Sequence, residues 1–571
     1  MLTTNTMNQN ESFPIDRKYI LSVLMLFICL FTAFFGYLIF KDRKEIFDKA
    51  FHNPDEYFNS SVSGNITRKF FPPMVRVHSL DPAQEYWHDG PYWQHIPPLF
   101  MYIEAGVFVL TNSVSIVAIR LTSAFMALLT GIICIASVYL YRKTLLSALA
   151  AFTAASLWAA SPFTRNLIDG RNFGHSDVLL ALLAMCCFAA LLWYLNEPSS
   201  VRKTYPLWKV LLVSFIISLP IVAKSLLGAI PAATFFIILY KDRGILSKTY
   251  VWSIVVFLIP NIAFYGALYL SAPTVFKNEV WVPLSHFKNF EGWARPWYTF
   301  LANYIPDLYS TFLTGYFYLL ILAAWHLLLS KTFSGKDKTL MLLTTGWFTW
   351  NLVVVSYIKS KSPNFIFQMY FMGIFAAVYL SLYYLHNFLK KYAISFQKVH
   401  SYMYIYGMRI ASVVALSTAV VWAYGITHIS QAQVMSDRGL AMDRRFYNLT
   451  LSLQSKIALD KNDLVVLSTG GTDCWMKYYP LFLTGAETRN YDQFYAFKNS
   501  PTLNMYDRVI FVSTVKRYFP TEFKSNLIYK DKYYWIFSFF PNDINDVLIK
   551  KLETNHIVQQ TTYNCTTIVT E

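Results

Sequence analysis

The sequence predicts a polytopic α-helical membrane protein with a small C-terminal α/β domain. Of its 571 residues, 55% are hydrophobic and only 14% are charged, which are too few charges to cover a soluble globule of this size. The apolar residues lie in long runs, and basic residues bracket those runs. Lipid therefore replaces water as the solvent for most of the chain.

The apolar runs have the length of transmembrane helices. A bilayer core of about 30 Å needs about 20 apolar residues per helix. Such stretches are centred near residues 30, 128, 153, 186, 214, 232, 260, 318, 347, 374 and 414. They predict about eleven transmembrane helices. The first run lacks a small-residue cleavage site, so we interpret it as an anchor rather than a signal peptide.

Basic residues set the predicted topology, because Lys and Arg accumulate on the cytoplasmic side. With a cytoplasmic N-terminus, six basic clusters fall on the inner face, near residues 17, 142, 202, 243, 336 and 391. One cluster, at 41–44, violates the rule. We predict an integral protein of the bacterial inner membrane with an extracytoplasmic C-terminal domain. The net charge of +16 fits loops that face anionic headgroups, and no basic motif indicates a nucleic-acid partner.

Two domains are expected. Residues 1–427 form the transmembrane domain, and 41–112 within it form a long first outer loop with interfacial helices such as 97–110. Residues 428–571 form the extracytoplasmic α/β domain, in which the runs that start at Asp463 and Asp507 read as buried strands. Long ordered loops usually carry function, so the first outer loop is the leading candidate for the active surface.

Adjacent carboxylates lie in the first outer loop. Asp55 and Glu56 follow Pro54 soon after the first span, and such a pair can supply a general base or hold a divalent cation. The proline favours a fixed turn there. The alternative interpretation is an ordinary solvated pair.

A second acidic position lies in the short loop 161–177. Asp177 begins an apolar run, so it could simply cap a helix. However, a carboxylate at the membrane mouth is costly without a partner, and Arg165, Asp169, Arg171 and His175 share the loop. Together they suggest a polar site that faces a cavity.

Several basic residues on the predicted outer face suit a phosphate group. They are His95, Lys224, Arg295, Lys359 and Lys361. The alternatives are a structural role for His95 and snorkelling for Lys224. We find no Walker loop, dinucleotide glycine motif or zinc-ligand spacing, so a nucleotide-driven enzyme is not expected.

These elements occur in a recognisable order. They are Pro54-Asp-Glu56, Tyr92-Trp-Gln-His-Ile-Pro-Pro-Leu99, the helix that starts at Arg120, Asp177-Val-Leu-Leu, Lys224-Ser-Leu-Leu-Gly228, Pro296-Trp-Tyr298 and Lys361-Ser-Pro-Asn364. The ordered set resembles the GT-C glycosyltransferases, in particular the branch with the aminoarabinose (lipid A) transferase and the protein O-mannosyltransferases. The sequence departs from the family pattern at Ile96, where the family has a phosphate-contacting lysine, and at Phe365 or Phe367, where a tyrosine is usual.

The resemblance implies an inverting glycosyltransferase that moves a sugar from a polyprenyl-phosphate donor to a lipid, glycan or protein hydroxyl at the outer membrane face. It implies Asp55 as the base, with Glu56 and Asp177 assisting and basic residues around the phosphate. Some family members use a divalent metal, which is possible here although nothing in the sequence requires one. The sugar and the acceptor stay open.

Two other classes of function compete with this one. A secondary transporter or lipid flippase would place ionisable residues near the span centres of inverted repeats, whereas the charges here concentrate at outer ends and loops. A membrane anchor whose C-terminal domain does the binding is the other alternative, although that domain shows no recognisable site.

Overall fold

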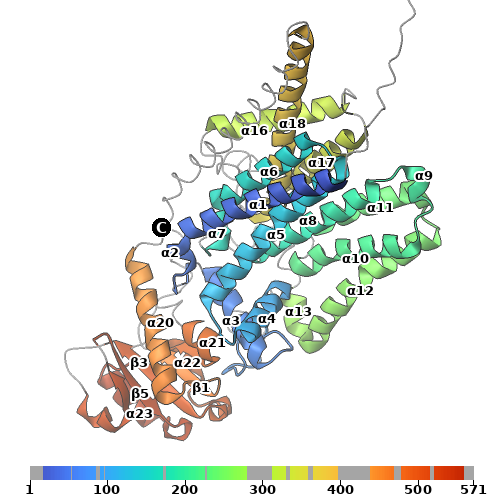
Figure 1. Ribbon diagram of the computed structural model, residues 1–571. Helices are drawn as coiled ribbons and strands as arrows, with labels where there is room; N and C mark the ends of the chain where they lie inside the picture. The colour runs from blue at the N-terminus through green and yellow to red at the C-terminus, as the bar shows by residue number, and fades with distance from the viewer. Residues whose placement is uncertain are drawn as a thin grey trace, which may run out of the picture.

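The protein is described by a computed structural model. It covers residues 17–49, 51–52, 54–84, 90–94, 97–170, 175–224, 228–279, 311–329, 333, 335–357, 364–396, 437–467, 478–514, 520–530 and 532–558. A bundle of long helices occupies one part of the molecule, and a domain with a β-sheet lies at one end of it (Figure 1).

Among the described residues, seven helices are long and apolar enough to cross a membrane. They are α1 (Arg17–Lys41), α5 (Ile116–Arg142), α8 (Ser176–Leu195), α10 (Leu207–Lys224), α12 (Lys248–Ser271), α17 (Gly335–Tyr357) and α18 (Asn364–Phe396). Three further predicted centres fall on α6 (Leu145–Ala160), α11 (Ala229–Arg243) and α16 (Thr311–Leu329). The eleventh centre, residue 414, lies outside the described residues.

The bundle closes around α6, which packs against α1, α5 and α18. Small side chains let its neighbours approach closely, and six of its alanines are completely buried: Ala148, Ala150, Ala151, Ala154, Ala155 and Ala160. At its far end Trp158 contacts Phe371 of α18 edge-on, with ring centroids 5.2 Å apart. The polytopic helical fold predicted from the apolar runs is confirmed.

The predicted inner loops lie together at one end of the bundle. Arg142 pairs with Asp337 at 2.8 Å. Lys336 Nζ donates a hydrogen bond of 2.7 Å to the Asn196 side-chain oxygen. These contacts join three loops that the positive-inside rule assigns to one face. Which end faces the cytoplasm stays a prediction.

Short helices fill the connections. They are α2 (Arg43–Ile46), α3 (Pro54–Arg68), α4 (Leu99–Thr111), α7 (Pro162–Ile168), α9 (Ser199–Arg202) and α13 (Pro273–Glu279). The helix α4 lies where the sequence predicts one and, at 13 residues, is too short to span a bilayer. The expectation of a fixed turn after Pro54 is wrong, because this proline is the first residue of α3, where its missing N–H has no helical partner to lose.

The C-terminal domain contains a five-stranded mixed sheet with the order β2-β1-β3-β5-β4. Its strands are β1 (Asp463–Leu467), β2 (Glu487–Asn490), β3 (Arg508–Thr514), β4 (Leu527–Lys530) and β5 (Tyr534–Phe539). The runs at Asp463 and Asp507 are therefore strands, as predicted. Around the sheet lie α20 (Asp437–Ile457), α21 (Tyr478–Thr484), α22 (Tyr491–Phe497), α23 (Asp546–Thr554) and the 3-10 helices η4 (Pro501–Met505), η5 (Thr521–Asn526) and η6 (Pro541–Asp543).

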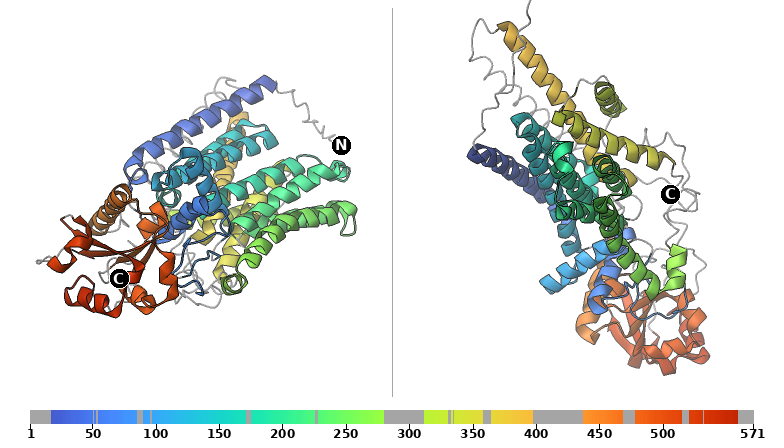
Figure 2. Two further views of the ribbon diagram at one scale, coloured as in Figure 1. Left: turned by 90° about the horizontal axis from the view of Figure 1, so that it is seen from below. Right: turned by 90° about the vertical axis from the view of Figure 1, so that its right-hand side faces the viewer.

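Each face of this sheet belongs to a different hydrophobic core. Side chains alternate between faces along a strand, so Val465 and Ile510 join a core with α20, α21 and the first loop. Their neighbours Val466 and Phe511 join a second core on the opposite face. Figure 2 shows α3 and α4 between the bundle and the sheet domain. The first loop, 41–112, therefore completes the core of the C-terminal domain.

A buried carboxylate fastens the loop to the sheet. Glu487 on β2 is completely buried and accepts hydrogen bonds from Arg489 Nε at 2.5 Å and from the Leu80 backbone N–H at 2.8 Å. The Tyr506 hydroxyl donates to the same carboxylate, and Arg76 Nε lies 3.8 Å from it. The Glu487 side chain thus contacts two arginines and the backbone of the first outer loop.

We expect Glu487→Gln to lower the free energy of unfolding by about 3 kcal/mol, because removal of one charge leaves its buried cationic partners uncompensated. Thermal unfolding in detergent measures this loss. The control is Glu522→Gln at an exposed position, which should shift stability by less than about 0.5 kcal/mol. Equal unfolding temperatures for both variants would contradict the assignment.

Candidate active site

A buried ion pair forms the centre of the candidate site. Glu56, in the first turn of α3, is 2% exposed, and Arg120 of α5 is 0% exposed. Arg120 Nε donates to Glu56 Oε1 and Nη2 donates to Oε2, both at 2.9 Å. The His52 backbone N–H donates to Oε2 at 2.8 Å. The guanidinium and the carboxylate thus form a bidentate ion pair, which has an additional backbone donor.

The charge of Glu56 is stabilised by this surrounding. Burial raises the pKa of the Glu56 carboxyl, but the Arg120 and His175 side chains outweigh burial and hold its pKa well below the usual range. Two charges removed from water need close and complete pairing. Here both carboxylate oxygens are occupied, so Glu56 stays ionised across the physiological range.

His175 extends the cluster to α8. Its Nε2 lies 3.2 Å from Glu56 Oε1, and its Nδ1 lies 2.9 Å from the Ser123 hydroxyl. Its ring stacks on Phe100, with centroids 6.1 Å apart and planes 10° apart. The residue immediately precedes α8 as its N-cap. Helices α3, α4, α5 and α8 therefore meet at one imidazole.

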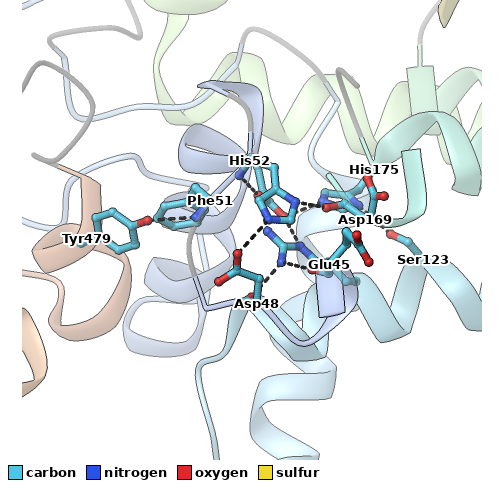
Figure 3. A network of polar contacts seen from close by, with 10 residues as sticks. Glu45, Asp48, Phe51, His52, Ser123, Asp169, His175 and Tyr479 are labelled. Atoms are coloured by element: carbon cyan, nitrogen blue, oxygen red, sulfur yellow. Dashed lines mark hydrogen bonds and ion pairs between the residues drawn. The ribbon is translucent and has the colours of Figure 1, made fainter. Parts of the chain in front are cut away.

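The opposite side of the cluster locks two loops together, as Figure 3 shows. The His52 ring nitrogen Nδ1 lies 2.7 Å from the Asp169 carbonyl oxygen, and Nε2 lies 3.4 Å from the Asp48 carboxylate. Arg120 Nη1 donates to the carbonyl oxygens of Glu45 and Asp48 at 2.8 and 2.7 Å. The first outer loop and the short loop that contains Asp169 are thus joined by hydrogen bonds and polar contacts.

Gly170 makes this close approach possible. Its φ is +81°, a conformation that residues with a side chain rarely adopt. A Cβ there would lie 2.4 Å from Glu56 Oε1. The glycine therefore meets a conformational and a steric requirement at once.

A second ion pair lies at the start of α8, two residues after His175. Lys224, the last residue of α10, donates to Asp177 Oδ1. Asp177 is 1% exposed, and its other oxygen, Oδ2, has no hydrogen-bond partner within the described part of the chain. A buried carboxylate oxygen without a donor is costly, which makes it a candidate for contact with a polar substrate.

Arg165 of α7 forms a third pair, with Asp42 at the end of α1. Both residues are less than 10% exposed. Arg165 Nη1 has no hydrogen-bond partner among the described residues. This pair connects the end of α1 to α7.

Glu104 of α4 is a buried carboxyl of a different kind. It is 1% exposed, and its described hydrogen bond comes from the Ser63 hydroxyl of α3. Burial raises the pKa of Glu104 to about 8, and the nearby charge of Glu56 contributes to the rise. At neutral pH the side chain is mostly a neutral carboxylic acid.

The structure unites some of the residues that the sequence singles out. Glu56 and His175 share one cluster, and Asp177 and Lys224 pair with each other. Asp55 lies beside Glu56 in the first turn of α3, and its side chain lies outside the description. The remaining candidates lie outside the described residues: His95, Arg171, Arg295, Lys359 and Lys361.

Sequence reasoning missed the partners of Glu56. Arg120 interrupts an apolar run, and an ionisable residue in such a run is a signal of function or of a buried partner. Glu104 interrupts the run 97–110 in the same way. His52 and Ser123 carried no comparable signal. Within the described ranges, no group of three or more His, Cys, Asp or Glu side chains is placed to hold a metal ion.

These observations define the class of protein. It is an integral membrane protein in which a polar cluster of buried ion pairs lies where the helix bundle meets a loop and sheet domain (Figures 1 and 3). Its unoccupied carboxylate oxygen and its cations lie together at the same end of the bundle. Asp177 Oδ2 and Arg165 Nη1, which have no hydrogen-bond partner among the described residues, offer one acceptor and one donor to a polar ligand.

Solved structures share this fold. ArnT from Cupriavidus metallidurans bound to undecaprenyl phosphate matches with a TM-score of 0.57 and 14% identity, over 90% of this chain and 98% of ArnT. Its apo state gives 0.55 and 15%, over 91% and 98%. The Archaeoglobus fulgidus oligosaccharyltransferase tethered with an acceptor peptide gives 0.51 and 14%, over 87% and 69%. Both proteins are GT-C enzymes, so the chain has the GT-C fold that the sequence resemblance predicted.

Sequence comparisons alone give no such result. No protein-family model matches the chain, and no curated protein matches it. The similarity therefore rests on the arrangement of helices and strands.

We expect Gly170→Ala to destabilise the protein by about 1 to 3 kcal/mol more than Gly244→Ala, because an overpacked site forces its neighbours apart. Gly244 is a control for backbone strain alone, since its φ of +78° and ψ of 155° also require glycine but no atom lies within 4 Å of its Cβ position. Thermal unfolding measures both variants. Equal losses would mean that only backbone conformation matters at position 170.

The raised pKa of Glu104 predicts a pH-dependent stability. The folded protein holds a proton at this site up to about pH 8, whereas the unfolded chain releases it near the ordinary pKa of a glutamate carboxyl, 4.5. The stabilising neutral form is fully present below about pH 4.5 and is lost as the pH rises through about 8. Glu104→Gln keeps a neutral side chain, so its unfolding temperature should exceed that of the wild type increasingly from pH 5 to pH 8.5. An equal difference at every pH would show that Glu104 does not titrate there.

Proposed function

We propose that the chain is an inverting glycosyltransferase that moves a sugar from a polyprenyl-phosphate donor to a hydroxyl acceptor at the outer face of the bacterial inner membrane. The observation that carries the proposal is the polar cluster around Glu56 and Arg120. It adjoins Asp55 in a fold shared with ArnT in complex with undecaprenyl phosphate.

The donor class is supported by the fold and by the charges at this end of the bundle. A lipid phosphate needs an apolar surface for its chain and cations for its headgroup. Lys224 ends a spanning helix and Arg165 lies nearby in sequence to His175, so both suit the headgroup. We assign the same role to His95, Arg171, Arg295, Lys359 and Lys361.

The reaction needs one proton acceptor. In the proposed step, Asp55 takes the proton of the acceptor hydroxyl while the hydroxyl oxygen attacks the anomeric carbon. The bond from that carbon to the phosphate oxygen breaks, and the polyprenyl phosphate leaves with the electron pair. Cations neutralise the charge that develops on the departing oxygen. Attack from the face opposite the phosphate inverts the anomeric centre.

Glu56 acts in this proposal as a positioning group. Both of its oxygens are engaged by Arg120, which supports a role in orienting the start of α3 rather than in proton transfer. Asp177 keeps one oxygen without a described donor, so we assign it a hydrogen bond to a substrate hydroxyl.

The acceptor class is a lipid, a glycan or a protein hydroxyl. The two enzymes with this fold differ by name in the group that they transfer, which is aminoarabinose in one and an oligosaccharide in the other. The acceptor and the sugar are therefore determined by direct assay.

The test is transfer by the purified protein from a panel of radiolabelled polyprenyl-phosphate sugars to membrane lipid, glycan and protein fractions. We expect Asp55→Asn to lower kcat at least about a hundredfold, because general-base catalysis contributes that much. Asp492→Asn is the control, since Asp492 also lies in the first turn of a helix, α22, and should keep full activity.

Two outcomes would contradict the proposal. Full activity in Asp55→Asn would remove the proposed base. No transfer from any donor, together with saturable lipid or solute movement in proteoliposomes, would favour a transporter or flippase.

A further inference from the structure

A tyrosine hydroxyl of the C-terminal sheet domain contacts the backbone next to the candidate site. Tyr479, on α21, accepts a hydrogen bond of 2.9 Å from the Phe51 backbone N–H. The two rings pack with centroids 4.5 Å apart, and both residues are completely buried. Figure 3 shows Tyr479 pointing from the C-terminal domain toward Phe51. The domain therefore contacts the backbone immediately before His52.

The position of this backbone controls one of the donors to Glu56. The His52 N–H donates to Glu56 Oε2 at 2.8 Å, and the His52 ring lies 2.7 Å from the Asp169 carbonyl oxygen. Tyr479 thus holds the N–H of Phe51, and Glu56 holds the N–H of the next residue, His52. A shift of this peptide would misplace the start of α3, which carries Asp55.

A second contact holds the other end of α3 to the same helix of the C-terminal domain. Arg68, the last residue of α3, donates from Nη2 to the Phe482 carbonyl oxygen at 3.0 Å. Between the two contacts Gly64 lets the helices touch, because a Cβ there would lie 2.7 Å from the same oxygen. The helix α21 therefore lies along α3 and fixes both of its ends.

The C-terminal domain also holds the segment that leads to His95. Residues 74 and 92 form an antiparallel bridge, and the Val75 N–H donates to the Pro91 carbonyl oxygen at 2.8 Å. Glu487 of the sheet fastens this hairpin through Leu80. On its far side, Gln94 Nε2 donates to the Leu268 carbonyl oxygen at the end of α12 at 2.9 Å.

We propose that Tyr479 is a positioning residue for the candidate active site, and that the C-terminal domain is a structural part of that site rather than a separate binding module. The kinetic part of this inference rests on the proposed function. The described hydrogen bond of Tyr479 goes to the Phe51 backbone and not to a side chain of the ion-pair cluster. Tyr479 acts through the peptide at Phe51 and His52, which orients the first turn of α3.

The first test measures local motion and needs no substrate. Tyr479→Phe removes only the hydroxyl and leaves the ring in the shared core. A hydrogen bond contributes about 1 kcal/mol, which corresponds to about a fivefold change in an equilibrium. We expect amide hydrogen exchange of peptides that cover residues 51–56 to accelerate about fivefold, with no change in peptides from α10. The unfolding temperature should stay close to that of the wild type.

The matched control is Tyr447→Phe. Tyr447 lies on α20 and packs its ring against Tyr479, with centroids 5.8 Å apart. Loss of this hydroxyl removes no described hydrogen bond to the first loop, so exchange at residues 51–56 should not change.

The second test is kinetic. In the transfer assay, Tyr479→Phe should lower kcat about five- to tenfold and leave KM for the donor unchanged, because misalignment affects the reacting geometry more than binding. Tyr447→Phe should keep the wild-type kcat. His52→Ala removes the ring contact with the Asp169 carbonyl oxygen. If this contact and Tyr479 hold the same segment, the double variant Tyr479→Phe/His52→Ala should lose no more than the more impaired of the two single variants.

The outcomes separate the two proposals. Wild-type exchange at residues 51–56 in Tyr479→Phe would overturn the positioning role. Faster exchange throughout the chain, together with a lower unfolding temperature, would also overturn it, because that result indicates general destabilisation. Losses of kcat that multiply in the double variant would overturn it as well. An absence of transfer by the wild type would contradict only the glycosyltransferase, because the exchange measurement needs no activity.

Discussion

Glu56 and Arg120 can occupy the interior of this protein only as a pair. Burial of either charge alone would cost several kcal/mol, and pairing with complete hydrogen bonding offsets that cost. The pair joins α3 of the first loop to α5 of the bundle. The other polar contacts of the site follow from its placement, because Arg120 also holds the backbone of the loop and Glu56 also receives His52 and His175.

This constraint explains why the first loop is ordered between two larger bodies. On one side, the loop supplies buried side chains to the core beneath the sheet. On the other, its α3 start is bound to the bundle through the ion pair. The start of α3 is therefore fixed relative to both the bundle and the sheet domain.

The similarity to ArnT and to the oligosaccharyltransferase lies in the fold, at 14% identity in both cases. A fold can host several chemistries, whereas the residues of the site determine which one occurs. The differences at Ile96 and at Phe365 or Phe367 fall on elements that the family resemblance assigns to the donor phosphate. The proposed reaction therefore assigns this phosphate to other cations, among them Lys224, which pairs with Asp177 in the structure.

Local patterns in the sequence determined most of the elements. Runs of about 20 apolar residues predicted helices at ten centres that the structure describes, and the buried runs at Asp463 and Asp507 predicted two strands of the sheet. The error at Pro54 has a local cause as well, since a proline can end one segment or begin a helix. Asp177 and Lys224 were recognised separately as unusual charges at the ends of apolar runs.

Only the tertiary structure decided which of these charges meet. Arg120 is 64 residues from Glu56 in sequence, and Tyr479 is 428 residues from Phe51. Periodicity depends on neighbours within a few residues, whereas these contacts depend on how α3, α5 and α21 pack against one another. The sequence by itself therefore determined a membrane bundle with acidic loops and a small sheet domain. The packing of the helices decided that Glu56 is a paired, buried anchor and that the sheet domain reaches the site.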